Sequence, residues 1–474
     1  MLLRQIEDPA LAQYAYLIGC QRSGEALVID PERDIARYRE IAASHGLRIT
    51  AVAETHIHAD FVSGAREFGE DPDITLYLSA EGGKDWTYQW PGSRERVTFL
   101  RDGDVFRIGN ISVQAIHSPG HTPEHLSYLI TDHGGGADEP MALATGDFLF
   151  VGDVGRPDLL ETAAGVAGVR EPSARQLRES LVGKLGPLPG FLQILPGHGS
   201  GSACGKALGA VPTTVLDYER RFNRALKLAQ ADATDFVEDI LSGQPEPPPY
   251  FARMKAVNRD GIVVTGGPCK PVRWSASQAG EFVAARRGRV LDTRGDREVF
   301  DDGHLPGAIH APFPGTFFLT SAGSYVNAEE EILLVVENPD DAGEMACQLY
   351  RIGLDRVVGF VTADDVKAMA TDVVPRVDFS DWKHEAESGV ILDVRTAAEF
   401  EAGHLPNAIN IAYTRLKPRL AEVPRTPRLP VHCGSGKRAA LAASFLRAEG
   451  FDAFHVDGLC EECDRIAEAQ GHAH

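Results

Sequence analysis

The chain has 474 residues, of which 43% are apolar, 24% charged and 8% aromatic, and this composition excludes disordered, collagenous and disulfide-scaffold proteins. A length of this size predicts about two to four domains. Acidic residues outnumber basic ones 68 to 47, which gives a net charge of -21 and disfavours nucleic acid and anionic membranes as partners.

The cysteine content points to a reducing environment. Seven cysteines are too few for a disulfide framework and odd in number, so we expect free thiols. The N-terminal residues lack a basic start followed by an apolar run, and no stretch reaches the roughly 18 apolar residues of a membrane span. The sequence therefore predicts a cytoplasmic protein that neither enters nor binds a membrane.

The first half of the chain alternates β-rich runs with helical stretches. We expect a helix over residues 34–46 and strands at 15–19, 25–30, 49–55, 73–79, 104–118 (with a turn at Gly109-Asn110), 125–131 and 141–148. These hairpins and meanders predict a sheet-on-sheet core covered by helices. Residues 212–241 are helical in period, and the proline run GQPEPPPY then breaks the pattern, so the first domain is predicted to span 1–245.

From about residue 270 the chain repeats itself. Residues 290–313 and 391–413 share a D-x-R motif, an acidic aromatic stretch and then GHLPxAI, and Asp292 and Asp393 occupy equivalent positions. Each copy reads as strand, helix, turn, strand and helix, which is typical of an open parallel sheet. The repeat predicts two similar α/β domains, at 270–372 and 375–474.

Histidines and acidic residues follow several strands of the first half. In each case a loop leaves an apolar strand, and neighbouring glycines permit tight turns that bring side chains toward one centre. These segments are THIHAD with His56, His58 and Asp60, SPGHT with His121, TGD with Asp147 and PGHG with His198. Imidazole and carboxylate side chains gathered in this way predict a metal site.

HxHxD, SPGHT, TGD and PGHG, in this order, resemble the metallo-β-lactamase superfamily and more narrowly its persulfide dioxygenases, over residues 1–240. The resemblance implies an αββα sandwich and a mononuclear Fe(II), with Zn(II) as a substitute, held by His56, His121 and Asp147. Two histidines and one carboxylate suit non-haem iron chemistry. The remaining motif residues would orient these ligands or add further ones, and they are His58, Asp60 and His198.

One position departs from the pattern of the dinuclear zinc hydrolases in this superfamily. Those enzymes read HxHxDH, whereas this chain has Phe61 at the last position and so lacks a nitrogen ligand of the second metal. The departure favours a mononuclear site. The alternative is that Asp60, Asp147 and His198 still bind a second ion weakly.

Other residues of the first domain have two open interpretations. Arg156, in GDVGRPDLLE, would bind an anionic substrate group through its forked donors or form an ion pair with Asp158 or Asp153. Cys204 follows His198 closely and would lie near the metal and contact substrate. Cys20 would carry a persulfide or simply fill the core.

The last domain contains a candidate nucleophile in the loop CGSGKR. Cys433 lies between an apolar strand and a helix beginning near Arg438, where loop N–H groups and the cations Lys437 and Arg438 favour a thiolate. The alternative is a buried structural cysteine. With GHLPNAIN upstream, the loop resembles the rhodanese family over residues 375–470. Cys433 would then accept a sulfane sulfur, cradled by Gly434 and Gly436.

The first repeat has Glu337, Asp340 and Asp341 where a thiol and cations are needed, and Cys347 lies deeper in the next helix. It resembles an inactive rhodanese kept as a spacer or docking surface. A C-x-x-C near the C-terminus is either a resolving pair for the active cysteine or without function, and it comprises Cys460 and Cys463.

The order of these segments resembles bacterial persulfide dioxygenase and sulfurtransferase fusion proteins. The resemblance implies that a low-molecular-weight thiol persulfide is oxidised by O2 to sulfite and thiol, and that Cys433 moves sulfur to or from thiosulfate, in sulfide detoxification. The alternatives are a zinc thioester hydrolase of the glyoxalase II type fused to a sulfurtransferase, and a non-oxidising sulfur relay. The thiol, the direction of transfer and homo-oligomer formation stay open.

Overall fold

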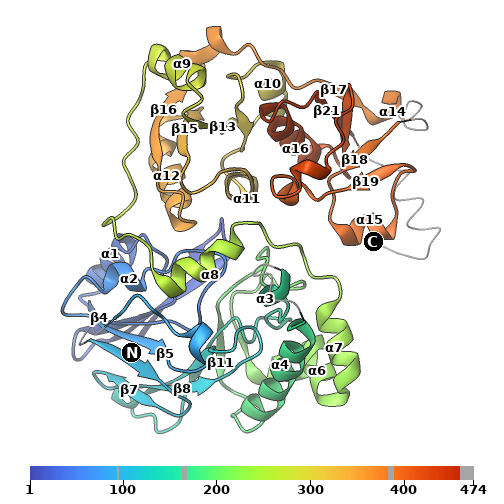
Figure 1. The fold of residues 1–474 in the computed structure, drawn as a ribbon. Coiled ribbons are helices and arrows are strands. Elements are labelled where there is room, and N and C mark those ends of the chain that lie inside the picture. The colour runs from blue at the N-terminus through green and yellow to red at the C-terminus, as the bar shows by residue number, and fades with distance from the viewer. Residues whose placement is uncertain (93–95, 163–167, 383–388, 459–474) are drawn as a thin grey trace. The chain divides into compact units, whose positions relative to one another are not determined.

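The computed structural model describes residues 1–92, 96–162, 168–382 and 389–458 and forms two compact units, Met1–Gly267 and Pro268–His474 (Figure 1). The first unit extends past the predicted end at 245. Helix α8 (Phe251–Asp260) follows the proline run and packs against the first unit. Asn258 of α8 donates hydrogen bonds to two carbonyl oxygens near the start of the chain. Among the described helices, none is long and apolar enough to cross a bilayer.

Two six-stranded sheets form the centre of the first unit. The first has the order β1-β2-β3-β4-β5-β6, formed by β1 (Leu2–Asp8), β2 (Gln13–Cys20), β3 (Glu25–Ile29), β4 (Arg48–Ala53), β5 (Thr75–Ser79) and β6 (Val97–Leu100). The second has the order β12-β11-β10-β9-β8-β7, formed by β7 (Val105–Ile108), β8 (Ile111–His117), β9 (Leu126–Asp132), β10 (Ala142–Gly146), β11 (Gln193–Pro196) and β12 (Thr214–Val215).

Apolar side chains from the facing strands fill the space between the sheets, including Tyr16, Leu27 and Tyr128. Tyr38 of α1 and Phe68 of α2 pack on the outer face of the first sheet. Helices α4, α6 and α7 cover the second sheet. The helices of the unit before α8 are α1 (Ala36–Ser44), α2 (Ala65–Phe68), α3 (Leu159–Thr162), α4 (Arg170–Leu185), α5 (Leu216–Phe222), α6 (Arg224–Ala231) and α7 (Ala233–Leu241). The predicted αββα sandwich is therefore confirmed.

The second unit contains two sheets whose paired strands are all parallel. One has the order β14-β13-β15-β16, formed by β13 (Gly288–Asp292), β14 (Ile309–His310), β15 (Glu331–Val336) and β16 (Val357–Thr362). The other has the order β17-β21-β20-β18-β19, formed by β17 (Arg376–Asp378), β18 (Ile391–Asp393), β19 (Ala408–Asn410), β20 (Leu429–His432) and β21 (Ala453–Asp457). Apart from β17, the two copies of the repeat have the same strand order.

The shared D-x-R motif makes the same contacts in both copies. Arg294 pairs with Asp292 at 2.7 Å, and Arg395 pairs with Asp393 at 2.7 Å. In both cases the arginine also donates to a glycine carbonyl oxygen after the next helix, at 2.8 Å. The helices of this unit are α9 (Ala276–Ala284), α10 (Arg297–Asp302), α11 (Thr316–Tyr325), α12 (Ala342–Arg351), α13 (Ala363–Val366), α14 (Phe379–Trp382), α15 (Ala397–Ala402) and α16 (Lys437–Ala448).

The two copies pack directly against each other. The Tyr325 ring of α11 stacks on the Phe445 ring of α16 with centroids 4.2 Å apart. His455 and Asp301, both fully buried, lie 2.8 Å apart across the same boundary. Helix α16, which follows the loop with Cys433, is therefore held by both copies of the repeat.

Candidate functional site

The predicted metal ligands meet where strands of both sheets end. His56 follows β4 of the first sheet, while Asp147 and His198 follow the parallel strands β10 and β11 of the second. His121 lies on the loop between β8 and β9. Parallel neighbours end at the same edge of a sheet, so residues far apart in sequence reach one place.

A glycine is required at the end of β10. Gly146 has φ 46°, and a Cβ atom there would lie 2.5 Å from Thr55 Oγ1 and 2.8 Å from His125 Nε2. Other residue types are strained in this conformation and would displace both side chains. Gly146 therefore lets Asp147 approach the histidines.

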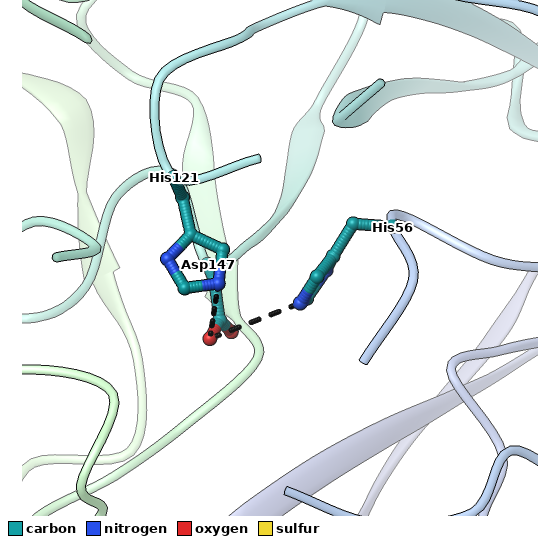
Figure 2. A group of neighbouring side chains, drawn as sticks. All are labelled: His56, His121 and Asp147. Atoms are coloured by element: carbon teal, nitrogen blue, oxygen red, sulfur yellow. Dashed lines mark ion pairs between the residues drawn. The ribbon is translucent and has the colours of Figure 1, made fainter. Parts of the chain in front are cut away.

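His56, His121 and Asp147 form a buried group whose ligand atoms all lie within 4.8 Å of one another (Figure 2). Asp147 Oδ2 is 3.5 Å from His121 Nε2 and 4.0 Å from His56 Nε2. Neither carboxylate oxygen of Asp147 accepts an N–H or O–H bond from the described residues. A buried carboxylate that accepts no such bond is costly, and a divalent cation between these three ligands would satisfy it. The residues therefore fit a metal ion.

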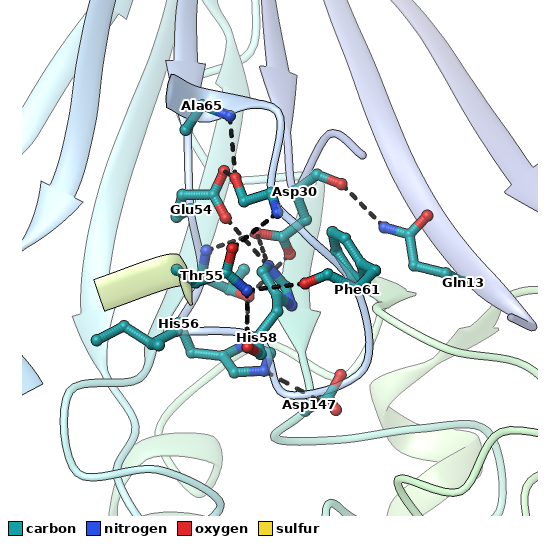
Figure 3. Close-up of polar contacts among 12 residues, drawn as sticks. Gln13, Asp30, Glu54, Thr55, His56, His58, Phe61, Ala65 and Asp147 are labelled. Carbon is teal, nitrogen blue, oxygen red and sulfur yellow. Dashed lines mark hydrogen bonds and ion pairs between the residues drawn. The ribbon is translucent and has the colours of Figure 1, made fainter. Parts of the chain in front are cut away.

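Hydrogen bonds fix both imidazoles in the tautomer that a metal needs. His121 Nδ1 lies 2.9 Å from the carbonyl oxygen of Arg156, which only accepts, so Nδ1 carries the hydrogen. His56 Nδ1 lies 2.9 Å from Thr55 Oγ1, whose own hydrogen goes to Asp30 at 2.8 Å (Figure 3). Both Nε2 lone pairs are thus left for a ligand at the centre.

Burial keeps the ligands in this state. It lowers the pKa of His121 to about 4, more than the hydrogen bond to the Arg156 carbonyl raises it, and it lowers the pKa of His56 well below its ordinary value. Burial also raises the pKa of Asp147 to about 6. The two histidines are therefore neutral at pH 7, as metal ligands must be.

His58 lies outside the group of His56, His121 and Asp147 and supports it indirectly, through Asp30. Its Nε2 is 3.2 Å from Asp30 Oδ1 and 3.1 Å from Glu54 Oε2 (Figure 3). Burial lowers the pKa of His58, but the two carboxylates raise it more, to well above its ordinary value. A protonated His58 therefore supports Asp30, which in turn orients Thr55.

Asp60, His198 and Cys204 form a second buried group of side chains that could hold a metal ion. His198 Nε2 lies 3.3 Å from Asp60 Oδ2 and 3.4 Å from Asp147 Oδ1, so it touches both groups. Burial raises the pKa of Asp60 to about 6 and the pKa of the Cys204 thiol well above its ordinary value. Phe61 has no donor atom and so supplies no ligand; its ring packs on the His58 ring with centroids 4.3 Å apart.

Arg156 forms an ion pair with Asp158, one of the two roles that the sequence left open for it. Its guanidinium bonds Asp158 at 2.8 and 2.7 Å, and Nη1 donates to the carbonyl oxygens of Ala203 and Pro245. The side chain is 1% exposed. These contacts use its donors within the protein, and its backbone carbonyl orients His121.

Two residues that support the centre were not predicted. His125 Nε2 accepts the backbone N–H of Asp147 at 3.1 Å. Asn258 donates to the carbonyl oxygens of His58 and Phe61, both at 2.8 Å, across about 200 residues of sequence. The histidine was recognisable from its place beside SPGHT, whereas nothing in the local sequence marks the asparagine.

The loop after β20 places Cys433 just before the first turn of α16. Cys433 is 1% exposed, and its sulfur accepts the N–H of Ala439 from the first turn of α16 at 3.4 Å. Gly436, with φ 77°, caps this helix. The N-terminus of a helix favours a negative charge, so the position suits a thiolate.

The two cations of the loop, Arg438 and Lys437, differ in their surroundings. Arg438 forms two hydrogen bonds with Glu399 of α15, at 2.7 and 2.6 Å. Partial burial raises the pKa of Glu399, but Arg438 lowers it more, to about 2. Lys437 is exposed. The charge of Arg438 is therefore balanced by a carboxylate, while that of Lys437 faces solvent.

The equivalent loop of the first copy, after β15, has the exposed acidic residues Glu337 and Asp340. Cys347 lies on α12, where it is partly buried. Cys20 is in the core between the sheets of the first unit. Cys460 and Cys463 lie outside the described residues.

Known proteins resemble both halves of the chain. Residues 8–198 match the metallo-beta-lactamase superfamily, and residues 378–462 match the rhodanese-like domain. The mitochondrial persulfide dioxygenase ETHE1 of Bos taurus is 31% identical over 250 residues, which cover 52% of this chain and 84% of that protein. The cytoplasmic hydroxyacylglutathione hydrolase of Arabidopsis thaliana is 32% identical over 191 residues, 39% of this chain and 63% of that protein.

A solved structure extends the likeness past the first unit. The crystal structure of a metallo-beta-lactamase from Staphylococcus aureus subsp. aureus COL has 36% identity and a TM-score of 0.66, and it covers 76% of this chain and 99% of its own. The chain belongs to the metallo-β-lactamase superfamily, with an N-terminal domain related to the ETHE1 persulfide dioxygenases and a C-terminal rhodanese-like domain.

Proposed function

We propose that the protein oxidises a low-molecular-weight thiol persulfide with O2 in its first unit and transfers sulfane sulfur at Cys433 in its second, in sulfide detoxification. In the first unit, one persulfide, one O2 and one water would give one thiol, one sulfite and two protons. The observation that carries the proposal is the buried group of His56, His121 and Asp147 in a domain related to persulfide dioxygenases. The same chain carries a rhodanese-like domain.

The side chains of the first unit have separate roles in this proposal. His56, His121 and Asp147 would hold an Fe(II) ion, which would supply the redox chemistry that O2 needs. Arg156 and Thr55 keep the imidazoles in position through the hydrogen bonds described above. Cys204 borders the site as a neutral thiol on the side of His198 and contacts substrate.

In the second unit, the Cys433 thiolate attacks the sulfane sulfur of thiosulfate. The sulfur–sulfur bond breaks, sulfite leaves with the electron pair, and Cys433 becomes a persulfide; the reverse step forms thiosulfate. The backbone N–H of Ala439, in the first turn of α16, stabilises the negative sulfur. The first repeat, with its acidic loop, is an inactive rhodanese-like domain in this proposal.

A zinc thioester hydrolase is the second candidate. The group of Asp60, His198 and Cys204 beside Asp147 favours it, because a second ion there would make the site dinuclear. The resemblance to hydroxyacylglutathione hydrolase favours it as well. The two candidates differ in their metal content and in their need for O2.

The test is oxygen uptake by full-length protein loaded anaerobically with Fe(II) and given thiol persulfides. We expect uptake with sulfite formation and close to one iron per chain. Protein loaded with Zn(II) and reactions given the thiol alone are the controls. Two tightly held ions at full activity, or thioester hydrolysis without persulfide-dependent uptake, would favour the hydrolase. A persulfide passed to acceptors without uptake would indicate a relay.

A further inference from the structure

An arginine of the first repeat reaches the Cys433 loop of the second. Arg297 begins α10, and its Nη2 donates to Oδ2 of Asp457, the last residue of β21, at 2.7 Å. A Cβ atom on Gly436 would collide with Asp457 Oδ1 and lie 3.1 Å from Arg297 Nη1. The Arg297–Asp457 pair therefore lies against the glycine that ends the Cys433 loop.

The charges around the loop explain why this pair matters. Arg438 is balanced by Glu399, so without Arg297 the carboxylate of Asp457 would place a negative charge beside Gly436 and offset the exposed Lys437. A negative charge there repels anions such as thiosulfate and sulfite. Arg297 cancels it, and both partners are about one quarter exposed, where water screens an ion pair only in part.

One donor of Arg297 is left over after this pairing. Nη1 is buried and makes no hydrogen bond with the described residues, although Nη2 is bonded to Asp457. A buried donor without a partner is unfavourable. Its position next to Gly436 means that an acceptor oxygen brought to this side of the loop would satisfy this donor.

We propose that Arg297 is a specificity-determining residue of the sulfur-transfer site, although it belongs to the repeat without a catalytic cysteine. By neutralising Asp457 at the Gly436 turn it allows the Cys433 loop to take anionic sulfur donors. This inference rests on the proposed sulfur transfer at Cys433. It gives the first repeat a part in the electrostatics of the reaction in addition to its packing role.

The experiment measures sulfur transfer from thiosulfate to cyanide by the full-length protein. We expect Arg297→Gln to raise the KM for thiosulfate about tenfold with kcat within about twofold, since an unbalanced charge near the loop weakens anion binding. Adding Asp457→Asn to that variant should return KM to near the parental value. Arg289→Gln is the matched control. Arg289 also links the two repeats, through an ion pair of 2.7 Å with Glu449, but Glu449 lies at the end of α16 far from Cys433.

The outcomes separate the inference from the proposed function. A parental KM in Arg297→Gln, or equal losses in Arg297→Gln and Arg289→Gln that Asp457→Asn does not reverse, would overturn the charge role. Mass spectrometry of Cys433 after thiosulfate treatment checks the underlying reaction. If the parent forms no persulfide at Cys433, the proposed transfer itself fails, and this inference fails with it.

Discussion

The metal centre and the Cys433 loop are assembled in opposite ways. The metal group draws side chains from separate loops of two sheets, and each imidazole is oriented by a partner such as the carbonyl of Arg156. At the Cys433 site, the sulfur and the N–H that bonds it both belong to the short segment from Cys433 to Ala439, and the paired charges around it come from other segments. The metal ligands are gathered by long-range packing, whereas the nucleophile and its N–H donor are placed by local geometry in the other unit, so each chemistry should be removable without the other.

Asp147→Asn should have the largest effect. The amide keeps the size of the side chain but is a poor metal ligand, so persulfide-dependent oxygen uptake should fall by more than the roughly 10–100-fold that a lost supporting contact costs. Because burial raises the pKa of Asp147, the metal-free variant should be no less stable than the parent. Iron content, oxygen uptake and sulfur transfer are measured together. A parallel loss of sulfur transfer would contradict the separation of the two sites.

Cys433→Ser is the reciprocal change. The hydroxyl is close in size to the thiol but scarcely ionised at neutral pH, so it cannot hold a transferable sulfur. Given persulfide and O2, the variant should consume oxygen and accumulate sulfite, while the parent converts part of the sulfite to thiosulfate. Both products are quantified in one reaction. Thiosulfate formed at the parental rate, after correction for the spontaneous reaction, would rule out Cys433 as the sulfur carrier.

Thr55→Val tests the remote support of the metal centre. It removes the hydroxyl that links His56 to Asp30 while keeping the shape of the side chain. We expect iron to bind about 10–100-fold more weakly. Thr55→Ser retains the hydroxyl and is the matched control. Equal affinities in the two variants would show that the imidazole needs no such orientation.

The same contrast explains what the sequence could predict. The hairpin at Gly109-Asn110, the sandwich and the Cys433 loop depend on patterns of neighbouring residues, and the structure contains all three. Asn258 was missed because its partners lie about 200 residues away. The first unit was predicted to end too early, since prolines end a helix but do not prevent the chain from returning to the same unit as α8.

Asp393, on the strand β18 beside the Cys433 loop, should make the stability of the protein depend on pH in the acid range. Burial raises the pKa of Asp393, but His432 and Arg395 lower it more, from 3.8 to about 2. A carboxyl whose pKa is lowered by folding stabilises the folded protein at any pH above the pKa that it has in the unfolded chain. Here the stabilisation is about 2 kcal/mol, and it is lost as the pH falls from about 4 to 2. Asp393→Asn should therefore unfold at lower urea than the parent at pH 7, with a smaller difference at pH 3. An equal difference at both values would assign the effect to packing.

The smallest effect is expected in the loop that replaces the Cys433 loop in the first repeat. Glu337 and Asp340 are exposed, and no thiol stands between them and the following helix. Substituting Glu337→Gln and Asp340→Asn together removes two surface charges, so both activities should stay within about twofold of the parent, as is usual for exposed positions. Oxygen uptake and thiosulfate formation are the measurements. A large fall in sulfur transfer without unfolding would mean that this acidic loop takes part in the reaction, and the contribution of the first repeat would then extend beyond Arg297.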